Sequence, residues 1–425
     1  MDPESPAAPL LHGAGGWNMR KTFAASLSAL LAALLVLFAI FVEFSRDATP
    51  THVDRYYSFL TDVLVMVFLG FGALMTFLKR YSYSAIALNY VLSCLVILEA
   101  LLAIGWAQEG WGTIAIDLPL MIDAAFCAGA AMISFGAVLG KASPAQILWL
   151  LALEVPPYAF AAEVVAGRWR VLDVGGSITI HAFGAVYGLA ASVFLSPKGA
   201  GAGNPKNGAS YASDMSAMLG TLFLFIYWPS FNGALAEGAQ GLCVMNTVVS
   251  LLGACLAAFA ASSLFGNRLN MVHVQNATLA GGVAIGSSAN LKLPPATSLA
   301  VGIAAGLLST FGYEAVSPFL EARCGITDTC GVANLHGMPG ILGGLASALF
   351  AWLYDNRSNQ SLILHGGKQP LYQLMGLGAA VGIAAVAGLA GGFIVSRVGV
   401  AGQALEVDKM YDDAVFWHEV EEEEH

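Results

Sequence analysis

Long apolar runs separated by short polar stretches extend along almost the whole chain. Each run holds roughly 20 residues, which is the length that a helix needs to cross a bilayer. The runs are continuous and do not alternate at every second residue, so a transmembrane β-barrel is excluded. The pattern predicts an all-α polytopic membrane protein with about twelve transmembrane helices. They lie near 22–42, 59–78, 86–106, 118–140, 146–166, 177–195, 215–235, 241–264, 272–288, 296–316, 337–353 and 371–396.

The composition supports a membrane protein that lies in the lipid bilayer. Of the 425 residues, 57% are hydrophobic and 11% are charged, and the mean hydropathy is +0.70. Soluble domains carry roughly 25% charged residues. The first run, 22–42, follows Arg20 and Lys21 as a signal peptide would, but it is longer than the usual apolar core of one. We therefore expect it to be an extra N-terminal transmembrane helix.

The basic residues indicate how the chain is oriented. An even number of spans puts both termini on one side, and with that side in the cytoplasm 11 of the 18 basic residues lie inside. These are Arg20, Lys21, Lys79, Arg80, Lys141, Lys198, Lys206, Arg268, Arg323, Arg397 and Lys409. The others are Arg46, Arg55, Arg168, Arg170, Lys292, Arg357 and Lys368. This bias predicts a cytoplasmic N-terminus at 1–21 and an acidic cytoplasmic tail at 397–425. The net charge of −10 gives no reason to expect a nucleic-acid partner.

The remaining spans form two groups. A segment rich in glycine and polar residues, 197–214, separates five spans at 59–195 from five at 215–353. This composition predicts a flexible cytoplasmic connector. The extra helix at 22–42 precedes the first group, and a final long helix at 371–396 follows the second.

The two groups share one spaced pattern, DVGGSITIHAFGAVYGL at 173–189 and DTCGVANLHGMPGILGG at 328–344. In both, an aspartate precedes a histidine by eight residues, one glycine follows the aspartate by three, and another follows the histidine by seven. The matched pairs are Asp173 and Asp328, Gly176 and Gly331, His181 and His336, and Gly188 and Gly343. The histidines belong to spans five apart, which cross the membrane in opposite directions. We therefore predict two five-helix inverted repeats with a site between them near the midplane.

His181 and His336 are the leading candidates for that site. Eight helical residues rise roughly 12 Å, so each histidine lies near the middle of the bilayer when its aspartate lies near an edge. Ionisable residues at this depth are usually functional, although two histidines that merely pack in the interior are the alternative. Without a third ligand at a suitable spacing they make a weak metal site. We expect no metal, no cofactor and no enzymatic reaction.

The surroundings of the histidines favour a small neutral solute. Acidic residues at the outer ends of the spans have no basic partners at equal depth, and they would concentrate cations there. They are Asp62, Glu99, Asp117, Asp123, Glu163 and Asp173. An ion would lose its hydration in the apolar middle, whereas a neutral imidazole offers one donor and one acceptor to a small polar molecule. Phe126, Phe231 and Asn232 are candidates to line this path. Ammonium collected as the cation and conducted as ammonia fits the combination.

Glycine is abundant, with 48 residues. Spacings of the type G-x-x-x-G allow helices to approach closely in a membrane. They occur at Gly282/Gly286, Gly340/Gly344, Gly378/Gly382 and Gly388/Gly392. The sequence therefore predicts tight helix contacts at these four places.

Several stretches of the sequence resemble the ammonium transporter superfamily, and more closely its Rh glycoprotein branch. They are GFGALMTFLKRY at 70–81, SFGAVLGK at 134–141, DVGGSITIHAFGAVYGL, TLFLFIYWPSFNGA at 221–234, MVHVQNATLAGGVAIG at 271–286, CGVANLHGMPGILGG at 330–344 and YDDAVFWHEV at 411–420. The resemblance implies the Amt/Rh channel fold in a plasma-membrane homotrimer with one pore per protomer. The extra first span also fits the Rh branch.

The resemblance also implies a role for each candidate residue. His181 and His336 match the twin pore histidines, and Phe126 and Phe231 match a phenylalanine gate. Asp173 and Asp328 match the aspartates of the two pore ends. Asn232 matches a polar neighbour of the gate, and Glu163, with a one-residue gap, matches a vestibule acid. Ala333 stands where many Rh relatives have a polar side chain, and this difference concerns the inner vestibule.

Three functions remain compatible with the sequence. The first is a channel for ammonia, which could also accept methylammonium. The second is a channel for CO2, alone or together with ammonia, because an apolar pore suits both gases. The third is a non-conducting scaffold or ammonium sensor, but retention of both histidines argues for transport.

Overall fold

The structure is a computed structural model that describes residues 14–46, 49–265, 268–398 and 404–418. Its long helices are α1 (Ala14–Phe41), α2 (Pro50–Val65), α4 (Ser82–Glu109), α5 (Leu118–Val138), α6 (Pro144–Ala162), α7 (Phe183–Leu195), α8 (Tyr211–Gly233), α9 (Gln240–Phe265), α12 (Pro295–Phe311), α14 (Met338–Leu353) and α15 (Gln369–Arg397). The short α-helices are α3 (Phe71–Leu74), α10 (Met271–Asn276), α11 (Ala280–Ile285) and α13 (Ser317–Phe319).

Helical turns of other types interrupt or extend these helices. The π-helical ones are η1 (Met66–Gly70), η3 (Glu163–Arg168), η4 (Ser177–Ala182), η7 (Gly312–Val316), η8 (Leu320–Cys324) and η9 (Ala333–Gly337). The 3₁₀ turns are η2 (Met75–Phe77), η5 (Ala277–Leu279), η6 (Gly286–Ser288), η10 (Gly366–Lys368), η12 (Val407–Lys409) and η13 (Asp413–Val415). Short π-helical turns are frequent at functional sites.

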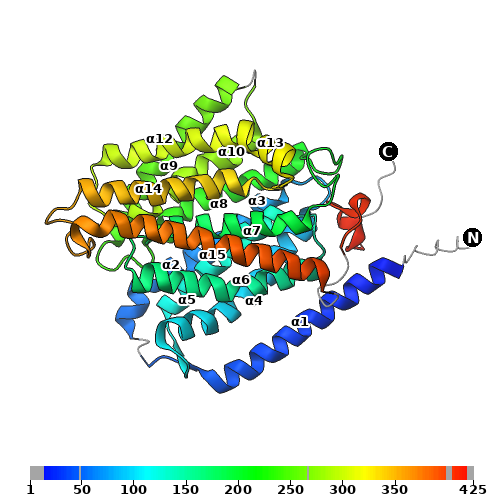
Figure 1. The fold of residues 1–425 in the computed structure, drawn as a ribbon, viewed down its shortest axis with the longest axis horizontal. Coiled ribbons are helices and arrows are strands. Elements are labelled where there is room, and N and C mark those ends of the chain that lie inside the picture. The colour runs from blue at the N-terminus through cyan, green and yellow to red at the C-terminus, as the bar shows by residue number, and fades with distance from the viewer. Residues whose placement is uncertain (1–13, 47–48, 266–267, 399–403, 419–425) are drawn as a thin grey trace, which may run out of the picture.

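The helices form an all-α bundle in which they run roughly parallel or antiparallel to one another (Figure 1). In the described part of the chain, 10 helical segments are long and apolar enough to cross a membrane. The two other predicted runs correspond to α8 and to the broken segment from α10 to η6. The polytopic helical fold is thus confirmed. The beginning of α1 and the turns η12 and η13 lie at the same end of the bundle, which we call the terminal face; the other end is the opposite face.

Helix starts follow from local sequence. Ser143 and Gln146 form a reciprocal capping box at the start of α6, and Ser210 and Ser213 do the same for α8. The Asp117 side chain accepts from the Leu120 N–H at 2.8 Å and caps α5. These caps satisfy backbone donors that would otherwise lie unpaired close to the membrane.

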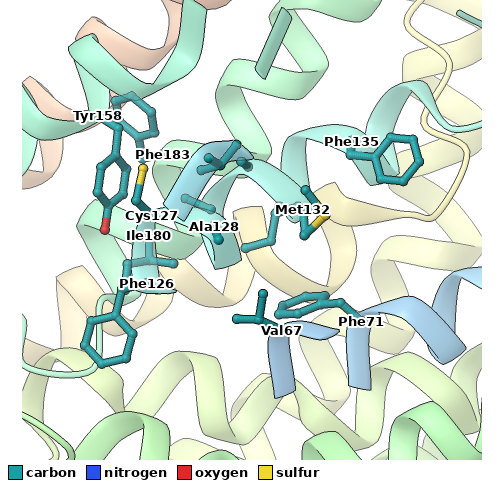
Figure 2. Packing of buried hydrophobic residues seen from close by; sticks show 14 of the residues in the cluster. Val67, Phe71, Phe126, Cys127, Ala128, Met132, Phe135, Tyr158, Ile180 and Phe183 are labelled. Atoms are coloured by element: carbon teal, nitrogen blue, oxygen red, sulfur yellow. The ribbon is translucent and has the colours of Figure 1, made fainter. Parts of the chain in front are cut away.

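The core surrounds α5, in which every residue from Ala124 to Val138 is buried. Figure 2 shows side chains of this core: Phe126 lies beside Cys127 and Ile180, and Phe71 lies beside Val67. Because α5 crosses the centre of the bundle, it contributes to the pore described below along most of its length.

Helix α1 lies apart from the bundle over much of its length (Figure 1), and only 11% of its apolar window is buried. It is joined to the bundle near its middle and directly after its C-terminal end. The Trp149 indole donates to the Ser26 hydroxyl at 3.0 Å, and strand β1 (Val42–Phe44) pairs in parallel with β2 (Ile114–Ile116). This strand pair was not predicted, because each strand has only three residues and Val42–Phe44 directly follows an apolar helix.

Three of the four predicted glycine spacings make close helix contacts. A Cβ atom on Gly388 would lie 2.3 Å from the Tyr187 carbonyl oxygen, and one on Gly340 would lie 2.6 Å from that of Ser177. A Cβ on Gly286 would likewise lie 2.8 Å from the carbonyl oxygen of Gly175. The fourth prediction was wrong: Gly378 and Gly382 have nothing within 4 Å of an added Cβ. A spacing of four puts both glycines on one face of a helix, but it does not say whether that face meets a neighbour.

The tightest glycine contact with a backbone atom in the described residues involves Gly302 in α12, which was not among the predicted ones. A Cβ there would lie 1.9 Å from the carbonyl oxygen of Ser250 in α9. We expect Gly302→Leu to destabilise the fold by about 3 kcal/mol or more, since the backbones of two helices would have to separate. Thermal unfolding of the purified protein in detergent measures this. Gly382→Leu is the control, and equal stability of the two variants would contradict the packing described.

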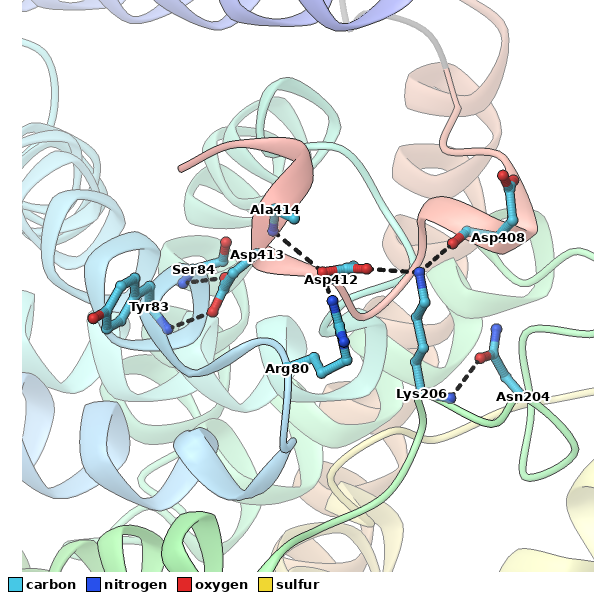
Figure 3. Close-up of polar contacts among 9 residues, drawn as sticks. All are labelled: Arg80, Tyr83, Ser84, Asn204, Lys206, Asp408, Asp412, Asp413 and Ala414. Carbon is cyan, nitrogen blue, oxygen red and sulfur yellow. Dashed lines mark hydrogen bonds and ion pairs between the residues drawn. The ribbon is translucent and has the colours of Figure 1, made fainter. Parts of the chain in front are cut away.

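The C-terminal segment 404–418 is folded against the terminal face (Figure 3). The Asp413 carboxylate accepts from the backbone N–H groups of Tyr83 and Ser84, both at 2.8 Å, and so caps α4. Asp412 pairs with Arg80 and with Lys206 of the connector, at 3.5 and 2.6 Å. The connector is therefore held by polar contacts on this face. The acidic residues 419–425 lie outside the described residues.

Candidate functional site

The two predicted histidines come together in the middle of the bundle. His181 lies in η4 and His336 in η9, the turns that precede α7 and α14. Their side chains are buried, at 1% and 3% exposure. Both turns follow a loop that contains the matched aspartate, so the same local design places each histidine from its own end of the bundle.

Asp173 holds η4 in place. Its Oδ1 accepts from the Ile178 N–H at 3.0 Å and from the Ser287 hydroxyl. Its Oδ2 accepts from the Thr179 N–H at 2.8 Å and from the Thr179 hydroxyl at 2.7 Å. Burial raises the pKa of Asp173, whereas these donors lower it. The carboxylate thus acts as a cap for the helix that carries His181.

Asp328 does the same for η9 from the terminal side. Its two oxygens accept from the backbone N–H groups of Val332 and Ala333, at 2.9 and 2.8 Å. Gly176 and Gly331, each three residues after its aspartate, have φ angles of +67° and +69°. This left-handed conformation is the one that glycine adopts at low cost. The sequence pattern shared by the two halves is therefore a shared backbone structure.

The two imidazoles are in direct contact. Their Nδ1 atoms lie 3.2 Å apart, and the rings stack with centroids 5.2 Å apart and planes 14° apart. Only one proton fits between two Nδ1 atoms, so in the neutral pair one ring carries its proton on Nδ1 and the other on Nε2. One outward-facing Nε2 then donates and the other accepts.

Phe126 and Phe231 close the path on the side of His181. Their ring centroids are 4.4 Å apart, and Phe231 lies 5.8 Å from the His181 ring. Both rings are at most 4% exposed. The two rings therefore lie between His181 and the opposite-face cavity that Phe126 lines.

A cavity of about 250 Å³ opens on the opposite-face side of the gate. Phe126 and Ile180 line it, together with the carboxylates of Asp123, Glu163 and Asp173. Glu163 lies in η3 and pairs with Arg168 at 3.3 Å. Arg168 offsets only one of the three carboxylates, so the net negative charge of this mouth attracts cations.

A second cavity, of about 180 Å³, opens on the side of the terminal face. His336, Leu335 and Phe71 line its inner end, and Asp328 lines its wall. The Phe71 ring lies 6.0 Å from the ring of His336. The two cavities, the gate and the histidine pair therefore form one interrupted path through a single chain.

Asn232 follows Phe231 in α8, and its side chain turns to α9 and α11. Its Nδ2 donates to the Thr247 hydroxyl and to the Gly282 carbonyl oxygen, both at 3.0 Å. It is fully buried. Seven of the eight predicted site residues thus line one of the two cavities or belong to the phenylalanine or histidine pair, whereas Asn232 lies next to Phe231 in the sequence and bonds neighbouring helices.

Some residues of the path were missed by sequence reasoning. The ring of Trp228 lies 5.5 Å from His181 and 6.4 Å from His336, and it backs the pair. The sequence does contain a signal for Trp228: it precedes Phe231 by three residues, so the two side chains lie on the same side of one helix. Ser287, which bonds Asp173, lies more than 100 residues away in the sequence and carried no local signal.

No group of three or more histidine, cysteine, aspartate or glutamate side chains in the described residues is placed to hold a metal ion.

Comparison with known proteins gives one consistent result. The family model described as Ammonium Transporter Family matches residues 27–416. The ammonium transporter Rh type C of Bos taurus is 40% identical over 438 residues, covering 94% of this chain and 95% of the relative. The ammonium transporter Rh type A of Canis lupus familiaris is 44% identical over 345 residues, covering 77% and 83%.

Solved structures agree with these relatives. Rh50 of Nitrosomonas europaea, described as one of the Rhesus protein family of channels, superposes with a TM-score of 0.75 at 32% identity. It covers 87% of this chain and 93% of its own. Mep2 of Saccharomyces cerevisiae superposes with a TM-score of 0.69 at 19% identity, covering 86% and 92%, and shares the fold.

Proposed function

The chain belongs to the ammonium transporter family, in its Rh branch, and from this premise we propose that it is a membrane channel that conducts ammonia. Ammonium would gather at the mouth on the opposite face, leave a proton there, and cross the middle as the neutral molecule. The twin histidines would carry it to the second mouth.

The observation that carries this proposal is the contact between His181 and His336 behind the Phe126–Phe231 gate. A cation at this point would face two neutral rings and aromatic side chains in place of its hydration shell, which is costly. Ammonia has both donors and an acceptor, so it can exchange hydrogen bonds with each imidazole in turn. The arrangement supports a path that excludes ions.

Asp173 takes part in this proposal through its position and charge. Four donors already occupy its oxygens, so we assign it the orientation of η4 and the negative field of the mouth. The released proton would return to the water of this mouth.

We further propose that the terminal face is cytoplasmic, in agreement with the distribution of basic residues, and that the channel lies in the plasma membrane as a homotrimer. Both mouths, the gate and the histidines come from one chain, which supports one pore per protomer. The mass of the detergent-solubilised complex, corrected for bound detergent, measures the number of chains.

The function is tested in proteoliposomes exposed to an inward ammonium gradient. We expect the interior to become alkaline faster than in vesicles without protein, because ammonia that enters takes up a proton inside. Equal rates would contradict the proposal. Internal acidification under a CO2 gradient in the same vesicles tests the alternative gas, and faster acidification than in empty vesicles would support it.

A further inference from the structure

A buried lysine lies beside the pore mouth on the terminal face. Lys141 follows α5 and precedes α6, and it is only 1% exposed. Its ammonium group donates to the Thr327 carbonyl oxygen at 2.7 Å and to the Thr327 hydroxyl at 2.8 Å. Both acceptors are neutral, and none of the ion pairs found among the described residues includes this lysine.

Burying an ammonium group without a paired carboxylate costs free energy, so we expect a functional reason for the position of Lys141. Burial lowers the pKa of Lys141 to about 7, and Asp328, Cys330 and Glu321 raise it in part. Asp328 and Cys330 come from the loop before η9, and Glu321 comes from η8.

Lys141 is connected to the inner histidine through a short chain of contacts. Thr327 is the neighbour of Asp328, whose carboxylate caps η9 and thereby sets the position of His336. The end of α5 holds the same loop a second time, since the Cys330 N–H donates to the Gly136 carbonyl oxygen at 3.2 Å. Lys141 and the end of α5 therefore both hold the loop before η9, which lines the cavity on the terminal face.

The two mouths differ at this point. On the opposite face, hydroxyl groups of Ser287 and Thr179 contact Asp173, and these donors are neutral. On the terminal face, the aspartate accepts only from backbone N–H groups and has an ammonium group near it. The fold thus places an ammonium group near the aspartate of the terminal face, whereas neutral hydroxyl groups contact the matched aspartate of the opposite face.

On the premise that the chain conducts ammonia, we propose that Lys141 is a positioning residue whose charge lowers the attraction of the cytoplasmic mouth for ammonium. When the lysine is protonated, it offsets the negative charge of Asp328. When it loses its proton, the mouth becomes more negative and collects cations more readily.

The sign of the pH dependence follows. Because the pKa of Lys141 is lowered to about 7, its positive charge is lost as cytoplasmic pH rises through that value. The concentration of ammonium needed for half-maximal transport from the cytoplasmic side should therefore fall as cytoplasmic pH rises. The half-saturating concentration at the outer mouth should not fall with rising pH in this way.

Uptake of radiolabelled methylammonium by inside-out and right-side-out membrane vesicles tests this, because each preparation exposes one mouth. Methylammonium stays protonated between about pH 6 and pH 8, so the concentration of the cation does not change. We expect the half-saturating concentration of the wild type at the cytoplasmic mouth to fall roughly three- to tenfold over this range, the effect of one partly screened charge.

Two variants separate charge from structure. Lys141→Met should show the low half-saturating concentration at both pH values, and Lys141→Arg should keep the high one at both. Neither should change half-saturation at the outer mouth. The proposal is overturned if the wild type shows no pH dependence at the cytoplasmic mouth, if Lys141→Arg titrates like the wild type, or if both mouths shift together.

The wild type and Lys141→Arg decide the question even if Lys141→Met does not fold. A wild type that transports no faster than control vesicles contradicts the proposed function itself, and this outcome is distinct from the three above.

Discussion

His181→Leu is expected to reduce ammonia-driven alkalinisation of vesicles to the rate of vesicles without protein. Leucine fills a similar space but removes the Nδ1 contact of 3.2 Å and leaves the His336 ring without its partner. The middle of the path would then offer no hydrogen bonds on the gate side, and the desolvation of ammonia would no longer be offset. His336→Leu should give the same result from the other side.

The matched control is His52→Gln, since His52 lies at the start of α2 and not along the path. This variant should conduct like the wild type. Equal folded yield and equal thermal stability of the three proteins would show that any loss of flux arises in the pore. Wild-type flux in His181→Leu would mean that the histidine pair is a packing element only.

Asp173→Asn is expected to lower both stability and flux. Asparagine has one acceptor oxygen where the aspartate has two, so two of the four donors would face its amide N–H group. Leaving buried donors unpaired costs about 2–5 kcal/mol in total. Since the same bonds orient η4, His181 should also lose its position, and we expect flux to fall by roughly tenfold or more.

The control for this change is the same substitution at Asp117. There the side chain caps α5 with a single accepted bond, and asparagine caps helices as well as aspartate does. Asp117→Asn should therefore unfold at the wild-type temperature and lose far less flux than Asp173→Asn. If Asp173→Asn behaves like Asp117→Asn, then Asp173 does not hold the pore helix. Thermal unfolding and vesicle flux measure both.

Much of the pore could be predicted because its chemistry is repeated in the sequence. Two copies of an aspartate, a glycine and a histidine at fixed spacing point to two equivalent backbone structures, and the left-handed Gly176 and Gly331 explain why the spacing is fixed. Residues far apart in the sequence were harder to find. Ser287 reaches Asp173, and Lys141 reaches Thr327, only because the fold brings their helices together.

The role of the two aspartates could be assigned only from the structure. Composition indicates an acidic mouth, but the pattern does not show whether a carboxylate faces the solute or the backbone. The carboxylate oxygens of Asp173 and Asp328 accept hydrogen bonds from backbone N–H groups, so their main effect is on the position of the histidines. The contact of the C-terminal segment with α4 also could not be predicted, because Asp413 and Ser84 are far apart in the sequence and only the fold brings them together.

The most direct test of the account is a simultaneous record of internal pH and electrical current in proteoliposomes under an inward ammonium gradient. The account predicts rapid internal alkalinisation with far less than one charge moved for each ammonia that enters, because the proton stays outside the gate. A current of one positive charge per ammonia, carried through the wild type and lost in His181→Leu, would contradict conduction of the neutral molecule.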